Sequence, residues 1–203
     1  MDFARTERSQ EIVDRLGAFI HDVVVPAEAQ AEQERATAPT EQSATVDRVK
    51  QQARDQGLWN LCVRNPDYGP GLSFVDYAPL AEMMGPHRLA QEATNCDAPS
   101  NINGDAMIIY GSAEQKERWL EPQLDGQIKS AFAMTEPKVA SSDASNIATT
   151  AVQDGDHWIL NGQKWYISGV LHPQCQYLMT VANTDPDGPR HGRHTQFLSL
   201  IHI

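Results

Sequence analysis

Apolar residues recur at helical spacing in the first part of the chain. The clearest stripe runs from Ile12 to Val24 and stops before Pro26, which predicts a helix with one buried face. Residues 27–45 are rich in Ala, Glu and Gln and hold few large apolar side chains, so we expect a mobile or surface segment there. A further helix is predicted over residues 46–56, where Gly57 ends it.

Two serines mark further helix starts. Ser73 is followed three residues later by Asp76, a pattern that caps a helix at its N-terminus. Ser112 begins the capping box S-A-E-Q, which predicts a helix that ends near Pro122. The chain is therefore expected to be helical up to about Gly126.

Beyond Gly126 the spacing of apolar residues changes from about 3.6 to about 2, which indicates strands. Asp154-Gly155 and Asn161-Gly162 are typical hairpin turns. We expect an α+β chain, with an all-helical domain at residues 1–127 and an antiparallel, β-barrel-like domain at residues 128–203. The last strand meets the end of the sequence, which we interpret as truncation of a longer protein. The expected strands are residues 128–134, 147–152, 158–160, 163–168, 177–182 and 196–201.

Composition narrows the classes of function. The 203 residues are 40% hydrophobic and 21% charged, which is typical of one large or two small folded domains. A net charge of -11 repels phosphate backbones and anionic lipid headgroups, so we expect no nucleic-acid partner and no binding to a membrane surface. No apolar run approaches the roughly 20 residues of a membrane span, and the first residues lack a targeting pattern. We therefore expect a cytoplasmic protein.

The sequence offers no metal site or disulfide framework. Cys62, Cys96 and Cys175 are far apart, are odd in number and form no C-x-x-C pair. The histidines in H-G-R-H at residues 191–194 are interpreted as solvated loop residues. Glycine-rich nucleotide loops and the G-x-S-x-G hydrolase motif are absent from the sequence.

One polar loop, residues 135–143, remains as a candidate site. It follows the first expected strand, and small polar residues at a strand end can present N–H groups and hydroxyls to an anionic or heterocyclic ligand. A plain surface loop with a helix cap would use the same residues, and composition alone favours that simpler interpretation.

Three segments resemble motifs of the acyl-CoA dehydrogenase family. Residues 132–137, F-A-M-T-E-P, look like its T-E-P signature, and residues 161–169, N-G-Q-K-W-Y-I-S-G, look like its N-G-x-K-x-W-I-T-N-G segment. Residues 110–120 resemble the helix that precedes the β domain in that family. The order of the three segments also agrees, and the resemblance covers most of the chain. It implies the family's N-terminal and middle domains, with a C-terminal helical bundle missing beyond Ile203.

The loop departs from the commonest family pattern. Most members carry T-E-P-x-x-G-S-D, whereas residues 139–143 read V-A-S-S-D, with one extra residue and Ala140-Ser141 where the glycine is expected. This resembles a branch in which some members act on longer-chain or 4-hydroxy acyl-CoA substrates. Tyr166 and Ser168 stand where the family has tryptophan and threonine, and they keep an aromatic plane and a hydroxyl.

The resemblance implies an FAD site. Residues 132–135 would lie along the isoalloxazine ring, with the Thr135 hydroxyl at its pyrimidine edge, where a donor stabilises the reduced ring. Tyr166 would lie against the ring, Ser168 would lie near N5, and Ser142 would contact both FAD and the CoA part of the substrate. The implied cofactor-binding residues are Phe132, Ala133, Met134, Thr135, Ser141, Ser142, Tyr166, Ile167 and Ser168.

The implied activity is α,β-desaturation of an acyl-CoA thioester with hydride transfer to flavin, as in fatty acid β-oxidation. Electrons would pass to an electron-transfer flavoprotein, and the full-length protein would be a homodimer or homotetramer. The catalytic base is expected in the missing domain, so no catalytic residue is assigned and the chain alone is expected to be inactive. Two alternatives stay open: a flavin oxidase or monooxygenase of the same fold, and a non-catalytic acyl-CoA- or flavin-binding module.

Overall fold

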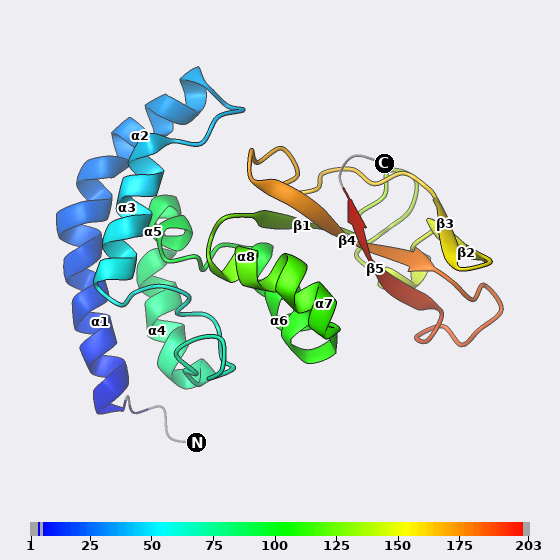
Figure 1. Cartoon of the computed structure of the whole chain (residues 1–203), viewed down its shortest axis with the longest axis horizontal. Coiled ribbons are helices and arrows are strands. Elements are labelled where there is room, and N and C mark those ends of the chain that lie inside the picture. The colour runs from blue at the N-terminus through cyan, green and yellow to red at the C-terminus, as the bar shows by residue number, and fades with distance from the viewer. Residues whose placement is uncertain (1–3, 5, 201–203) are drawn as a thin grey trace. The chain divides into compact units, whose positions relative to one another are not determined.

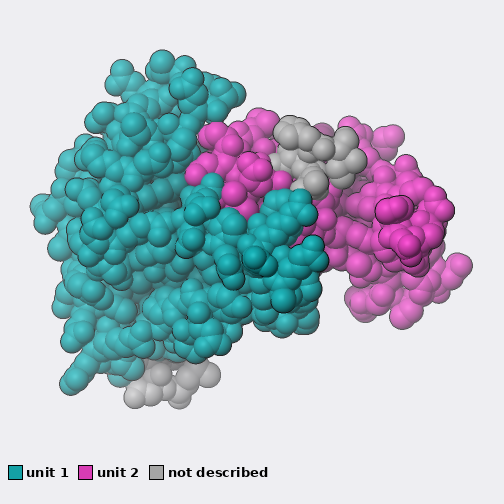
Figure 2. Space-filling model, in the orientation of Figure 1, with its two compact units in different colours: residues 1–127 teal, residues 128–203 magenta. Residues whose placement is uncertain are grey.

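The chain forms two compact units, residues 1–127 and 128–203, coloured separately in Figure 2. The computed structural model describes residue 4 and residues 6–200. The first unit is built from helices and the second around a five-stranded sheet (Figure 1). Within the described part of the chain, no helix combines the length and the apolar character that crossing a bilayer requires.

Short helices follow one another through the first unit. The serine caps predicted from the sequence are present: Ser73 Oγ accepts the Asp76 N–H at 3.2 Å, and Ser112 forms a capping box with Gln115. The helices are α1 (Glu7–Phe19), α2 (Val25–Thr37), α3 (Ala44–Asp55), α4 (Phe74–Met84), α5 (Arg88–Ala93), α6 (Ser100–Tyr110), α7 (Ala113–Gln115) and α8 (Glu121–Leu124). Two π-helical turns join α1 to α2 and α7 to α8: η1 (Ile20–Val24) and η2 (Lys116–Leu120).

The first helical segment is longer than the sequence predicted. Helix α2 passes through Pro26 and continues to Thr37, so the first part of the segment expected to be mobile or on the surface is a helix that lies at the surface. Pro26 stands at the start of α2, directly after the π-helical turn η1 that carries the helix from α1 into α2. Ala27 and Ala31 are buried, so small alanines rather than large apolar residues make the packed face.

The core of the first unit lies between α1, α3, α4 and α5. Leu16, Phe19, Val49, Leu80 and Leu89 are at most 2% exposed. Each such side chain stabilises the fold by roughly 1.5–3 kcal/mol on burial. The stripe from residue 12 to residue 24 supplies the α1 side of this core, as its periodicity predicted.

The second unit is a mixed sheet. Its strands are β1 (Lys129–Ala133), β2 (Thr150–Asp154), β3 (His157–Asn161), β4 (Cys175–Asn183) and β5 (His194–Leu200), and η3 (Ala144–Asn146) is a short 3-10 turn. β2 pairs with β3 and β4 pairs with β5 in antiparallel fashion, but β1 runs parallel to β4. The β domain after the helices is confirmed, whereas the purely antiparallel pattern is wrong. The long connection between β1 and β4 is what allows the parallel pair.

Of the two predicted hairpin turns, only the first exists. Asp154 pairs with His157, which leaves Gly155 and Asp156 as a two-residue turn. After β3 the chain does not return as a strand, so the strand predicted over residues 163–168 is wrong. The predicted strand at residues 196–201 is β5 as far as Leu200, and its last residue lies outside the described residues.

Gly162 serves close packing rather than a hairpin turn. Its φ lies outside the left-handed region, unlike that of Gly155 at 58°. A Cβ at position 162 would lie 2.2 Å from Thr149 Oγ1 and 2.8 Å from Thr149 Cα. Residue 162 must therefore lack a side chain because the Thr149 segment passes against it.

Candidate functional site

A buried carboxylate organises the loop after β1. Glu136 is 5% exposed, and it accepts hydrogen bonds from the backbone N–H groups of Ala148 at 2.8 Å and Thr149 at 2.9 Å. Lys164 Nζ lies 2.8 Å from Glu136 Oε1 and also donates to the Met134 carbonyl at 3.0 Å. Three segments that are distant in sequence thus meet at one side chain.

The charge state of Glu136 follows from these contacts. Burial by itself raises the pKa of Glu136, but the hydrogen bonds from Lys164 and from the Ala148 and Thr149 amides outweigh it and lower the pKa to about 2. Glu136 is therefore ionised at neutral pH. Because its oxygens are already engaged, it acts as a structural anion rather than as a proton acceptor for a substrate.

Ser141 closes the loop that begins at Glu136. Its Oγ accepts the Glu136 N–H at 2.8 Å and lies 3.3 Å from the Val139 carbonyl, to which it donates. The Ser141 side chain is buried, so this serine stabilises the loop from its buried side. Ser141 takes the place that the common family pattern gives to glycine, and its hydroxyl holds the loop by side-chain hydrogen bonds.

The end of the loop is held by a second set of contacts. Asp143 accepts hydrogen bonds from the Ser145 N–H at 3.0 Å and the Ser145 hydroxyl at 2.6 Å, which caps η3. Arg190 Nε donates to Ser145 Oγ at 2.8 Å, and its Nη2 pairs with Asp143. The loop before β5 thereby fixes the far end of the V-A-S-S-D segment.

The two motif segments run side by side next to the ion pair between Glu136 and Lys164. The Trp165 N–H donates to the Thr135 carbonyl at 3.0 Å. The Trp165 and Tyr166 rings contact each other with centroids 4.7 Å apart. Tyr166 is 83% exposed and has a φ of 51°, a left-handed conformation that costs energy in a residue other than glycine. An exposed aromatic ring held in a strained conformation makes Tyr166 a candidate for ligand binding.

A cavity of about 400 Å³ lies beside these rings. Its volume is in the range of small-molecule and cofactor pockets, roughly 300–1,000 Å³. The apolar lining includes Ala133, Leu160 and Leu178, while Thr180 and Ser199 supply hydroxyl groups. Such a lining suits a flat heterocycle that is apolar over its faces and polar at its edges.

Thr149 adds a polar group to this cavity. It is 5% exposed, it lines the cavity, and its Oγ1 lacks a close hydrogen-bond partner within residues 4 and 6–200. This oxygen is enclosed against Gly162, so a ligand could recover the free energy of the unpaired hydroxyl only after the Thr149 side chain turns toward the cavity. A second space of about 250 Å³ shares Thr149 and Gly162 with the first and extends to Lys138 and Gln163.

The structure brings some of the predicted cofactor residues together. Ala133, Tyr166 and Ile167 line the 400 Å³ cavity. Thr135 is exposed and is joined to the second motif through its carbonyl. Phe132 and Met134 are half-buried and do not line the cavity, although the Met134 carbonyl binds Lys164. Their contact with a cofactor stays a prediction.

The three predicted serines have different surroundings. Ser141 is buried and bonded within its own loop, whereas Ser142 and Ser168 are exposed and do not line the cavity. Their assigned roles toward FAD and CoA also stay predictions.

The sequence reasoning missed three residues of the site. Glu136 and Lys164 were quoted within the motifs but were given no role, and Thr149 was assigned only to a strand. The signal for the first two was present, because each motif carries one residue of opposite charge at a fixed position. Thr149 gave no such signal, because its surroundings depend on Gly162, which packs against it only in the folded structure.

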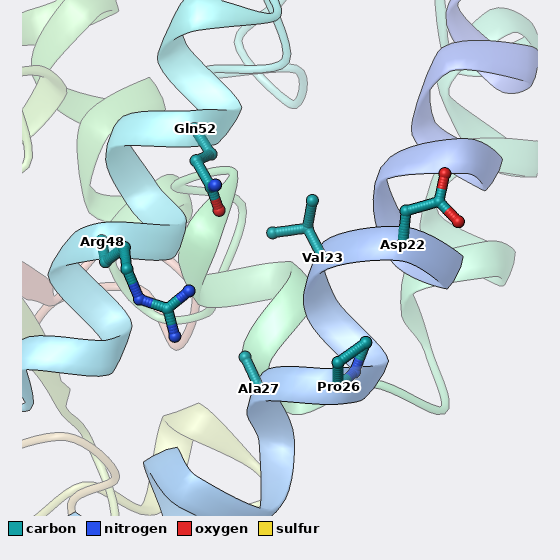
Figure 3. Close-up of a pocket in the computed structure, with 6 residues that line it drawn as sticks. All are labelled: Asp22, Val23, Pro26, Ala27, Arg48 and Gln52. Atoms are coloured by element: carbon teal, nitrogen blue, oxygen red, sulfur yellow. The ribbon is translucent and has the colours of Figure 1, made fainter.

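The first unit holds a smaller cavity of about 170 Å³. Arg48 and Gln52 reach into it from α3 toward Val23 and Ala27, while Asp22 points away (Figure 3). It is smaller than the cavities that usually hold a cofactor. Within the described residues, no group of three His, Cys, Asp or Glu side chains is arranged to hold a metal ion.

Family models match nearly the whole chain. The acyl-CoA dehydrogenase N-terminal domain matches residues 6–127, and the acyl-CoA dehydrogenase middle domain matches residues 131–199. The chain is 41% identical over 205 residues to Probable acyl-CoA dehydrogenase FadE2 of Mycobacterium tuberculosis. The matched region covers 99% of the chain and 50% of FadE2. It is also 37% identical over 202 residues to human acyl-CoA dehydrogenase family member 11. That matched region covers 97% of the chain and 26% of the human protein.

Solved structures agree with this assignment. A Mycobacterium abscessus structure assigned as an acyl-CoA dehydrogenase is 42% identical, with a TM-score of 0.92 over 98% of this chain and 51% of that one. An acyl-CoA dehydrogenase from Geobacillus kaustophilus is 25% identical, with a TM-score of 0.70 over 96% of this chain and 48% of that one. The chain thus spans about half of the structures it matches, and half or less of the two curated relatives. With two family domains matched in order and the fold reproduced, the chain belongs to the acyl-CoA dehydrogenase family.

Proposed function

We propose that the whole protein is an FAD-dependent acyl-CoA dehydrogenase that desaturates an acyl-CoA thioester between its α and β carbons. We further propose that the 400 Å³ cavity of the second unit receives part of the flavin ring. Family membership supports the reaction class. The observation that carries the site is a cavity of cofactor size that is bordered by the strained, exposed Tyr166 and has Thr149, Thr180 and Ser199 in its lining.

The residues of this chain fit such a cofactor. The Tyr166 ring is exposed and available to cover one face of a planar ligand. The hydroxyls of Thr149, Thr180 and Ser199 would bond to polar edge atoms. The ion pair between Glu136 and Lys164 touches no ligand in this scheme; it holds the two motif segments at a fixed separation.

A bound flavin supplies a hydride acceptor for the hydrogen that leaves the β carbon. The α-proton must leave to a base on the other side of the same bond, because both hydrogens depart from adjacent carbons. Glu136 does not suit that role, since its carboxylate is saturated by Lys164 and two backbone amides. Because the chain spans only about half of the relatives it matches, we propose that the base belongs to the remaining part of the protein.

The acyl-CoA substrate, an electron-transfer flavoprotein as electron acceptor, and assembly into a homodimer or homotetramer belong to the same proposal. The names of the relatives support the substrate class. The acceptor and the assembly state rest on membership of the family, which is an argument by analogy.

The decisive experiment is anaerobic reduction of the whole, FAD-reconstituted protein by a series of acyl-CoA thioesters. We expect loss of the yellow flavin absorbance and formation of a 2-enoyl-CoA product, with slow return of the colour when oxygen is admitted. Protein that retains no FAD after reconstitution would overturn the cofactor assignment. Rapid reoxidation by oxygen would instead identify an oxidase.

A further inference from the structure

Two of the three cysteines lie next to each other in the first unit. Cys62 Sγ is 3.7 Å from the Asn95 carbonyl, which belongs to the peptide bond that joins Asn95 to Cys96. The Cys96 side chain also lies close enough to Cys62 to influence the pKa of the Cys62 thiol. Sequence spacing gave no hint of this pair, because the residues between them include the whole of α4 and α5.

The backbone around both cysteines is held firmly. The Asn60 N–H donates to the Thr94 carbonyl at 2.9 Å, and the Asn95 side-chain amide donates to Asn60 Oδ1 at 2.7 Å. Asn60 and Asn95 both adopt left-handed conformations, with φ of 57° and 56°. These hydrogen bonds join the loop around Asn60 to the loop around Asn95. Each loop carries one of the two cysteines next to these contacts.

The two thiols differ in accessibility. Cys62 is half-buried, and Cys96 is 6% exposed and belongs to the hydrophobic core. Tyr77 on α4 packs against the same core. An oxidant would reach Cys62 first, with Cys96 positioned behind it as the resolving thiol.

We propose that Cys62 and Cys96 are a thiol redox site, in which a peroxide converts the pair to an intrachain disulfide. The Cys62 sulfur attacks hydrogen peroxide, the O–O bond breaks, and a sulfenic acid and one water form. The Cys96 sulfur then displaces the sulfenic oxygen, which leaves as a second water while the S–S bond forms. The two thiols lose two electrons and two protons, and one peroxide is reduced to two waters.

The surroundings set the rate of this reaction. The neighbouring Cys96 thiol and burial both raise the pKa of the Cys62 thiol, and the Asp105 carboxylate on α6 acts in the same direction. The pKa of Cys96 is lowered, but Cys96 is buried, so the thiolate is scarce at neutral pH at Cys62, the sulfur that an oxidant reaches first. We expect oxidation to need an excess of peroxide and to run far more slowly than that of an exposed thiol.

The test uses the 203-residue chain, treated with excess hydrogen peroxide and then alkylated after denaturation. We expect the number of free thiols to fall from three to one, with the third being Cys175. A peptide map should show one cross-linked pair, containing Cys62 and Cys96, that separates on addition of dithiothreitol. Three free thiols after treatment, or a disulfide between two molecules or through Cys175, would overturn the proposal.

Two variants complete the test. Cys175→Ser is the matched control, because Cys175 is a buried thiol in the other unit; it should still form the disulfide and end with no free thiol. Cys62→Ser should keep both of its remaining thiols free after the same treatment. The peptide map of the unsubstituted chain decides the proposal even if Cys62→Ser fails to fold.

Discussion

Lys164 Nζ lies 2.8 Å from Glu136 Oε1, and this ion pair joins the two segments that border the proposed flavin cavity. The Glu136 and Lys164 side chains are 5% and 12% exposed. For a pair removed this far from water, the loss of one partner is costly, because the other charge is left buried without its counter-charge.

Glu136→Gln should destabilise the β unit. The neutral amide leaves the Lys164 ammonium without its charged partner, so we expect the free energy of unfolding to fall by about 3 kcal/mol. Urea unfolding followed by circular dichroism measures this. Asp156→Asn removes an equal charge from the exposed turn between β2 and β3 and should change stability by no more than about 0.5 kcal/mol. Equal effects of the two variants would contradict a structural role for the ion pair.

The same carboxylate predicts a pH dependence. The pKa of Glu136 is lowered from 4.5 to about 2, so its stabilising contribution is complete above pH 4.5 and is lost as the pH falls toward 2. The difference in unfolding free energy between the unsubstituted chain and Glu136→Gln should therefore shrink over this interval. Unfolding curves at several pH values measure the difference. A gap that stays constant down to pH 2 would show that Glu136 is not the titrating group.

Thr149→Val should separate binding from stability. Among the residues that the structure describes, the Thr149 hydroxyl has no close hydrogen-bond partner, so its removal should change the free energy of unfolding by less than about 1 kcal/mol. We expect the affinity of the whole protein for FAD to fall roughly tenfold, the loss of about one hydrogen bond. Flavin titration followed by fluorescence measures it. Thr150→Val is the control, because that hydroxyl bonds to the Asn161 carbonyl and does not line the cavity. If FAD affinity is unchanged in Thr149→Val, the hydroxyl does not face the cofactor.

Gly162→Ala should show that this glycine is required by packing. The added methyl group would meet the Thr149 side chain and backbone, so we expect a loss of about 3 kcal/mol in the free energy of unfolding. Gly155→Ala gives the comparison, because a Cβ there meets no atom within 4 Å and only the φ of 58° is costly, at about 1 kcal/mol. Thermal unfolding of both variants measures the two costs. A smaller loss at position 162 than at position 155 would contradict the packing argument.

Tyr166→Gly should weaken cofactor binding without unfolding the protein. Glycine removes the strain of the left-handed backbone, which offsets the lost contact with the Trp165 ring, so the free energy of unfolding should change by less than about 1 kcal/mol. We expect the purified whole protein to retain less FAD, as measured by its absorbance, while Tyr166→Phe keeps the ring and retains it. Undiminished FAD content in Tyr166→Gly would remove this ring from the proposed site.

Local chemistry made parts of the fold visible in the sequence. The stripe from Ile12 to Val24 and the caps at Ser73 and Ser112 depend on residues three or four positions apart, so they could be read directly. The Asp154-Gly155 turn is equally local. The motif segments also identified the family, because their residues and order are properties of the chain itself.

Other features were decided only when distant segments met. The parallel pairing of β1 with β4 joins segments separated by a long connection, and no local pattern specifies it. At Asn161-Gly162 a strong turn signal was overridden, because Thr149 packs against the glycine and the following segment turns inward through Lys164. The sequence by itself determined the order of a helical unit and a β unit, several helix caps and the family. Only the tertiary structure decided that Glu136 and Lys164 form a pair, that Thr149 is left with a buried hydroxyl, and that Cys62 lies beside Cys96. Each of these features depends on which distant segments pack against each other and are thereby removed from water.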